Sequence, residues 1–194
     1  MIDRRQFTAM LAASAAGTAL SAIPAVSAEI GDDGLHIQPF FMQTFLDLAE
    51  DKAEAEAQGK HFAVLFEQRG CPYCREMHEV NFARPEIADY VAANFGILQL
   101  NMWGNRAVTD FDGQELEEKE LARKWRVNFT PTIVFFGPGS DDEVMRMPGY
   151  FKPFHFISMF EYVADDRYRE QGFQRFLQAR FDRLEEEGKD PDLW

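Results

Sequence analysis

The chemistry that this sequence can perform centres on Cys71 and Cys74, its only two cysteines. Pro72 and Tyr73 separate them in the stretch FEQRGCPYCREMHEV. A disulfide between residues this close removes little entropy from the unfolded chain, so it stabilises a fold only weakly. The pair therefore predicts redox chemistry or metal binding rather than a structural cross-link.

Metal binding by the two cysteines would need further ligands. A structural zinc site takes four, and the histidines of the chain form no pair with the usual ligand spacing. Haem attachment requires a histidine directly after the second cysteine, where Arg75 stands. A Cu(I) site made by Cys71, Cys74 and His78 stays open as an alternative function, because these soft ligands suit that ion. The redox reading needs no metal and no cofactor.

The cysteines lie where a predicted strand meets a predicted helix. Residues 61–67, HFAVLFE, have the composition of a buried strand, Gly70 introduces a turn, and Pro72 suits the first turn of a helix. Unpaired N–H groups and the helix dipole stabilise a thiolate at this end of a helix. We therefore expect Cys71 to be the exposed nucleophile and Cys74, one turn further, to be partly covered and to resolve a mixed disulfide.

The rest of the sequence alternates predicted helices and strands. Helices are expected over 39–59, 72–82, 85–95, 115–125 and 153–187, the last with a break at Gly172. Strands are expected over 61–67, 96–102, 126–136 and 142–150, with a hairpin over 103–114 around Asp112-Gly113. This order predicts an α/β fold, a three-layer sandwich with a mixed central sheet. An extra helix from about residue 166 is expected to pack on its body through Phe173, Phe176, Leu177 and Phe181.

Residues 1–28 are predicted to be a cleaved export signal. Arg4 and Arg5 precede an alanine-rich, weakly apolar stretch that ends in the small residues before the expected cleavage point after Ala28. The paired arginines resemble a twin-arginine signal, with Sec export as the alternative. Residues 29–194 are then expected to form a single domain, monomeric and periplasmic.

The charge of the chain limits its partners. The formal net charge is −13, with a sequence pI of about 4.7. Nucleic acids and anionic membranes both present negative charge, so neither is an expected partner.

These features resemble the thioredoxin superfamily. The strand, the CPYC turn and the helix are followed further along the chain by Thr130 and Pro131 at the start of a strand. The resemblance covers about residues 40–163. It implies that Cys71 is the nucleophile, that Pro131 is a cis-proline facing the disulfide, and that Thr130 meets the substrate.

Three stretches, FEQRGCPYCREMH, NFTPTIVFF and RMPGY, are most similar to the exported thioredoxins of bacterial sulfur-oxidation (Sox) systems, the SoxW type. This resemblance implies a periplasmic thiol–disulfide oxidoreductase that reduces a disulfide of an exported client, such as a sulfur-carrier protein. It also implies a membrane electron donor of the CcdA or DsbD type.

Two departures from thioredoxin matter. Thioredoxins carry a buried aspartate where this chain has Leu65, and Glu67 either replaces it as proton acceptor for Cys74 or is an exposed carboxylate at the end of the strand. The Pro-Tyr pair is that of glutaredoxins, which implies a potential between the two families. An oxidant or isomerase of disulfides is a further alternative, although residues 103–114 leave too little chain for the helical insertion of DsbA-type oxidants.

Overall fold

A four-stranded mixed sheet forms the centre of the molecule in the computed structural model, which describes residues 29–189. The predicted export signal lies outside the described residues. The strand order is β2-β1-β5-β6, with β1 parallel to β2 and antiparallel to β5, and β5 antiparallel to β6. The strands are β1 (His61–Glu67), β2 (Phe95–Asn101), β5 (Thr132–Phe136) and β6 (Glu143–Pro148). The predicted mixed sheet is confirmed.

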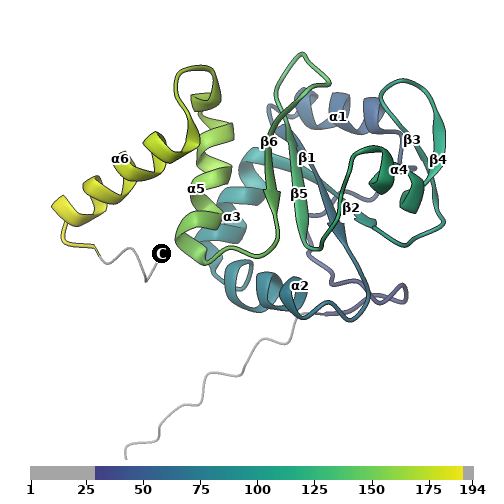
Figure 1. The fold of residues 1–194 in the computed structure, drawn as a ribbon, viewed down its shortest axis with the longest axis horizontal. Helices are drawn as coiled ribbons and strands as arrows, with labels where there is room; N and C mark the ends of the chain where they lie inside the picture. The colour runs from purple at the N-terminus through teal and green to yellow at the C-terminus, as the bar shows by residue number, and fades with distance from the viewer. Residues whose placement is uncertain (1–28, 190–194) are drawn as a thin grey trace, which may run out of the picture.

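Helices cover both faces of this sheet (Figure 1). On one face, α3 (Pro85–Asn94) and α5 (Pro153–Ala164) enclose a core, and on the other face α1 (Leu48–Ala57) and α4 (Glu118–Lys124) enclose a second core. The result is the three-layer sandwich that the order of elements predicted.

The central strand β1 is buried on both faces because its side chains alternate between these two cores. Ala63 and Leu65 belong to the core under α3 and α5, whereas Phe62, Val64 and Phe66 belong to the core under α1 and α4. A strand covered on both faces reads as a continuous apolar run, as this one does. Its firm packing fixes the point at which the chain leaves the sheet and enters the cysteine turn.

The predicted helix over 39–59 is wrong in its first half. Helix α1 begins only at Leu48, after Asp47, whose side chain accepts hydrogen bonds from two N–H groups of the first turn. The preceding residues run along the edge of β2, where the Met42 N–H donates to a β2 carbonyl at 2.8 Å. Phe45 is therefore fully exposed instead of lying on a buried helical face. Backbone pairing at the sheet edge outweighs the helical spacing of the apolar residues.

Two other elements differ in their limits. The hairpin consists of β3 (Ala107–Thr109) and β4 (Glu115–Glu117), and its turn contains Gly113 at a φ of 78°. Helix α4 consequently begins later than predicted. The helix after the cysteines is α2 (Pro72–Glu76), which continues directly into a π-helical turn, η1 (Met77–Asn81).

The C-terminal extension forms a short 3-10 turn, η2 (Arg167–Arg169), and then α6 (Phe173–Glu186), which lies beside α5 at one end of the molecule (Figure 1). Phe176 is buried against α5, as predicted, but Phe181 is 38% exposed. The predicted packing is therefore confirmed for Phe176, whereas Phe181 is more exposed and meets the body only through the Phe154 ring of α5, with centroids 6.3 Å apart.

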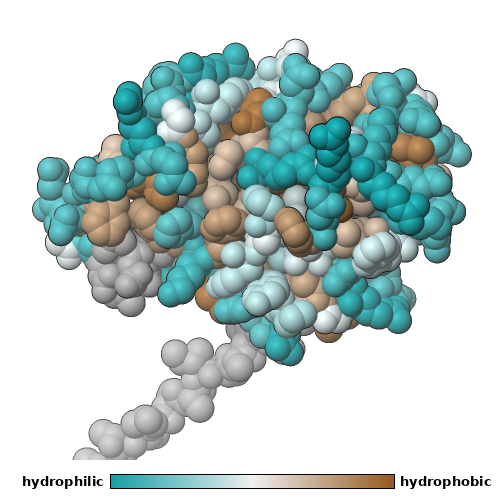
Figure 2. Space-filling model, viewed as in Figure 1, coloured by the Kyte–Doolittle hydropathy of each residue, from teal (hydrophilic) through white to brown (hydrophobic). Residues whose placement is uncertain are grey.

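The face shown in Figure 2 is mainly hydrophilic, with small separate apolar patches. Among residues 29–189, no helix combines the length and apolar character needed to cross a bilayer.

Candidate functional site

A disulfide between Cys71 and Cys74 lies at the start of α2. Cys71 is the N-cap residue in extended conformation, and its Sγ accepts a hydrogen bond from the Cys74 N–H at 3.1 Å. A sulfur at this position receives an N–H dipole even before it becomes a thiolate, so the backbone is arranged to stabilise the anion. Cys71 is 4% exposed and Cys74 is 0% exposed, so both are less accessible than predicted.

The loop before β5 covers Cys71. The Thr130–Pro131 peptide bond is cis, and the Thr130 Oγ1 and carbonyl oxygen lie 3.4 Å and 3.5 Å from the Cys71 Sγ. The loop is held from both sides, because the Pro131 carbonyl accepts from the Gly149 N–H at 2.7 Å and the Thr132 hydroxyl donates to the Phe129 carbonyl at 2.7 Å. The structure thus brings Cys71, Cys74, Thr130 and Pro131 together from segments distant in sequence.

Exposed aromatic rings flank this site. Tyr73 is 59% exposed within the CPYC turn, and Phe129 is 60% exposed next to Thr130. Trp103 is also 60% exposed, and its indole N–H donates at 2.6 Å to Gln68, just before the cysteine turn. Trp103 and Phe129 were not predicted as site residues. Flat apolar side chains around a reactive sulfur offer contact area to a polypeptide substrate.

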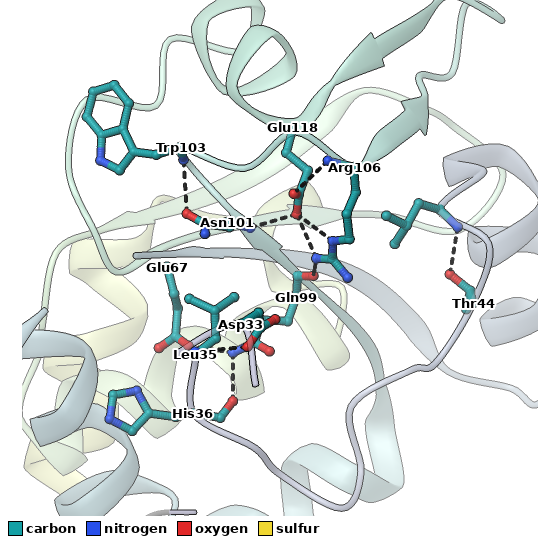
Figure 3. Close-up of polar contacts among 11 residues, drawn as sticks. Asp33, Leu35, His36, Thr44, Glu67, Gln99, Asn101, Trp103, Arg106 and Glu118 are labelled. Atoms are coloured by element: carbon teal, nitrogen blue, oxygen red, sulfur yellow. Dashed lines mark hydrogen bonds and ion pairs between the residues drawn. The ribbon is translucent and has the colours of Figure 1, made fainter. Parts of the chain in front are cut away.

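Glu67, at the end of β1, is completely buried. Its Oε1 accepts a hydrogen bond from the His78 Nε2 at 2.9 Å, and its Oε2 accepts one from the Gln99 Nε2 at 2.5 Å. Figure 3 shows its carboxylate beside Gln99 and the ring of His36. The interpretation of Glu67 as an exposed carboxylate is therefore wrong.

His78, in η1, is buried and uses both ring nitrogens. The second nitrogen, Nδ1, lies 2.9 Å from the Gln38 Nε2. The His78 ring stacks on His36 with centroids 4.7 Å apart and an angle of 18°. Burial, followed by the neighbouring His78, lowers the pKa of His36.

The copper alternative is not favoured by this arrangement. Among residues 29–189, the side chains that gather as potential metal ligands are His36, Glu67 and His78, without either cysteine. Both nitrogens of His78 are already hydrogen-bonded, so this ring would have to give up a partner to bind an ion. This group is a hydrogen-bonded network rather than a preformed metal centre.

Sequence reasoning missed three members of this network: His36, Gln38 and Gln99. Gln99 had a detectable signal, because it is a polar residue inside an apolar buried strand, and such a group needs a partner. His36 and Gln38 lie ahead of α1, and no local sequence pattern indicates that this segment contacts His78 in η1.

A family model for the thioredoxin-like domain matches residues 48–164, which is more than half of the chain. The chain belongs to the thioredoxin-like family. The matched region contains the cysteine turn and the Thr130–Pro131 loop, and it ends with α5. Helix α6 follows the matched region.

The chain is also similar to several solved structures. A thioredoxin-fold protein from Helicobacter pylori is 20% identical, with a TM-score of 0.52, over 63% of this chain and 85% of that one. A thioredoxin from Thermus thermophilus is 29% identical over 60% of this chain and 83% of that one, with a TM-score of 0.48. A DsbH oxidoreductase is 14% identical over 77% and 94%, with a TM-score of 0.45. A search of curated proteins gives no match.

Proposed function

We propose that this thioredoxin-like protein is a periplasmic thiol–disulfide oxidoreductase that reduces a disulfide of an exported client. The observation that carries the proposal is the Cys71–Cys74 disulfide at a helix start, with Thr130 in contact with the Cys71 sulfur. These two cysteines form a dithiol that can be oxidised and reduced without any other group.

The reaction has two sulfur transfers. In the reduced protein, the Cys71 thiolate attacks a client disulfide and forms a mixed disulfide, and one client sulfur leaves as a thiolate with the bonding electron pair and takes a proton from water. Cys74 then loses its proton and attacks the Cys71 sulfur, which breaks the mixed disulfide and releases the second client thiol. The client gains two electrons, and the protein is left as the Cys71–Cys74 disulfide.

Glu67 is proposed as the group that takes the proton of Cys74. Cys74 is fully buried, so water does not reach its thiol directly, and Glu67 is a fully buried carboxylate at the end of the preceding strand. General acid–base catalysis of this kind is typically worth 10² to 10⁴ in rate, so loss of the carboxylate should be easily measured.

The reducing direction is supported by what surrounds the site. Residues 103–114 contribute a small hairpin, β3 with the turn to β4, where DsbA-type oxidants carry a helical insertion. The bacterial periplasm is kept oxidising by the DsbA–DsbB system, so a reductant there must be recharged across the membrane. A donor of the CcdA or DsbD type fits this need, and a sulfur-carrier protein fits the Sox resemblance as client.

The export route completes the proposal. The paired arginines of residues 1–28 favour twin-arginine export to the periplasm, with cleavage after Ala28. A fusion of these residues to a reporter should move it to the periplasm. Replacement of Arg4 and Arg5 by lysine should stop this movement if the route is twin-arginine and leave it intact if the route is Sec.

A turnover assay tests the activity. The purified protein without residues 1–28 should catalyse insulin reduction by a small dithiol reductant, and the Cys71→Ser variant should not exceed the background rate. Wild-type turnover equal to that background would contradict the proposed activity.

A further inference from the structure

A hydrogen-bonded path joins the buried carboxylate of Glu67 to a surface pocket. The pocket has a volume of about 540 Å³ and lies between the N-terminal segment and β2, and Gln38 and Gln99 are among the residues that line it. Both glutamines are half-buried. From the pocket, Gln38 reaches the His78 Nδ1 and Gln99 reaches the Glu67 Oε2.

Each carboxylate oxygen of Glu67 accepts one hydrogen bond from a neighbouring side chain. The NH₂ group of Gln38 only donates, so the His78 Nδ1 accepts from it and the His78 Nε2 carries the hydrogen that is donated to the Glu67 Oε1. Gln99 donates to the other carboxylate oxygen. Two of the roughly four lone-pair sites of the carboxylate remain free to take a proton.

The thiol that loses a proton is close to this network. Cys74 and His78 lie one helical turn apart on the continuous segment formed by α2 and η1. Side chains at this spacing have Cβ atoms about 5–6 Å apart. Cys74, His78 and Glu67 are all at most 1% exposed, so a proton exchanged among them stays out of contact with bulk water.

The pocket and the site that would receive the client use different residues. In the mixed disulfide the client is bonded to Cys71, under the loop that contains Thr130. Among the described residues, those that line the pocket belong neither to the CPYC turn nor to this loop. The pocket and the cysteine site are therefore built from different residues, and in the proposed path the proton meets water on the pocket side.

Hydrogen bonds from and to neighbouring residues hold Gln99 in place. The Arg106 guanidinium donates to the Gln99 carbonyl at 3.1 Å and to the Glu118 Oε1 at 2.6 Å, so the backbone of Gln99 is anchored (Figure 3). The Gln99 amide also donates to the His36 carbonyl at 2.8 Å.

Three titratable groups act on the network from outside the Glu67–His78 pair. They are His36, which stacks on His78, and Arg75 and Glu79, whose charges reach His36 from α2 and η1. The lowered pKa of His36 disfavours a positive charge on the ring that stacks on His78.

We propose that His78 and Gln99 position Glu67 as the proton acceptor of Cys74, and that Glu67 returns this proton to water through the pocket lined by Gln38 and Gln99. The inference rests on the proposed function. The Cys74 S–H bond breaks as its proton passes to a free lone pair of Glu67, and the Cys74 sulfur then bonds to the Cys71 sulfur while the client sulfur leaves with the electron pair. Water that replaces the Gln99 amide at Oε2 removes the proton and restores the carboxylate.

Rapid mixing of the reduced protein with an aromatic disulfide that releases a coloured thiolate separates the two sulfur transfers. The first release reports attack by Cys71, and the second reports attack by Cys74. In the His78→Leu variant we expect the second release to slow about tenfold at neutral pH, since the fixed donor to Glu67 is lost. The first release should keep its wild-type rate, which also shows that the variant is folded.

Two variants distinguish positioning from packing. His78→Gln retains a side-chain N–H donor and should recover most of the second rate, whereas a site that needs only apolar packing would accept leucine better than glutamine. His155→Leu, at an exposed histidine outside this network, serves as the matched control with a wild-type second rate. The pH profile of the second release should lose its neutral plateau in His78→Leu and rise with pH as direct ionisation of Cys74 takes over.

The Gln99→Leu variant tests whether the proton leaves Glu67 through the pocket. It should slow the second release about as much as His78→Leu does, because it removes both a donor to Glu67 and the contact with the pocket. A wild-type second rate in His78→Leu and Gln99→Leu would overturn the inference and leave the proposed function intact. Absence of a first release from the wild-type protein would overturn the proposed function itself.

Discussion

The Glu67 Oε1 lies 2.9 Å from the His78 Nε2, and neither side chain is accessible to solvent. A pair of this kind is costly to bury unless its remaining hydrogen-bonding capacity is used, and here Gln38 and Gln99 use it. His78 lies one helical turn from the buried Cys74. The pair is therefore placed to take part in proton transfer from that thiol.

The most direct test of Glu67 is its replacement by glutamine, which keeps the shape and removes the base. Resolution of a preformed mixed disulfide at Cys71 should slow by about 100-fold at neutral pH, which is the lower end of the usual range for general-base catalysis. Stopped-flow measurement of thiol release gives the rate, and urea unfolding should show a similar free energy of unfolding. A resolution rate that stays at the wild-type value across neutral pH would show that Glu67 is not the acceptor.

The two cysteines should differ in reactivity. Cys71 receives the Cys74 N–H at the helix start, whereas Cys74 is fully buried, so Cys71 should be alkylated faster in the reduced protein near neutral pH. Peptide mass spectrometry after a short alkylation pulse measures both rates. Cys74→Ser should accumulate long-lived mixed disulfides, and Cys71→Ser should form none. Equal alkylation of the two thiols would argue against the assignment of the nucleophile.

Asp51 predicts a pH dependence of stability. Burial raises the pKa of its carboxyl to about 6, although the Thr44 hydroxyl, which donates at 2.9 Å, lowers it. The pKa in the folded state lies above the unfolded value, so this stabilising contribution is complete in acid and is lost as the pH rises through about 6. Asp51→Asn should raise the free energy of unfolding at pH 7 by on the order of 2 kcal/mol.

The check is urea unfolding between about pH 4 and pH 7. The Asp51→Asn curve should lack the fall in stability that the wild-type protein shows over this range. The exposed Asp89→Asn variant is the matched control and should follow the wild-type curve. A fall of equal size in wild type and Asp51→Asn would place the titrating group elsewhere.

The C-terminal helix should contribute to stability through its buried side. Phe176 is 7% exposed against α5, so Phe176→Ala should lower the free energy of unfolding by about 3 kcal/mol. Phe181 is 38% exposed, and Phe181→Ala should cost less than about 1 kcal/mol. Denaturant titration compares the two variants.

Truncation after Asp165 distinguishes this packing role from a partner surface. We expect the truncated protein to lose stability, because it lacks the buried face of α6. Unchanged stability together with weaker capture of client proteins would instead make α6 a docking element.

The sequence was most informative where local chemistry decides the structure. The apolar run of β1, the turn at Gly70 and the helix-starting Pro72 predicted the position of the cysteines, because each signal acts over a few residues. The partners of Glu67 were not predictable in the same way. His36 and Gln38 meet His78 only after the chain has folded back over η1, and no local pattern encodes that contact.

The first half of the predicted helix over 39–59 is wrong for the same reason, a contact between distant parts of the chain. The helical spacing of Phe41, Phe45 and Leu48 is real, yet Phe41 and Met42 instead pair with the backbone of β2, and Leu46 adopts a φ of 64° before the helix starts. Asp47, a residue type favoured at helix N-caps, marks the later start of the helix in the structure. Tertiary pairing therefore limits what periodicity alone can establish.

The most direct test of the central claim is the thiol state of Cys71 and Cys74 in living cells, trapped by acid and then alkylated. The account predicts reduced cysteines in cells that carry a membrane donor of the CcdA or DsbD type, and oxidised cysteines once that donor is deleted. Cysteines that are oxidised whether or not the donor is present would contradict a reducing role.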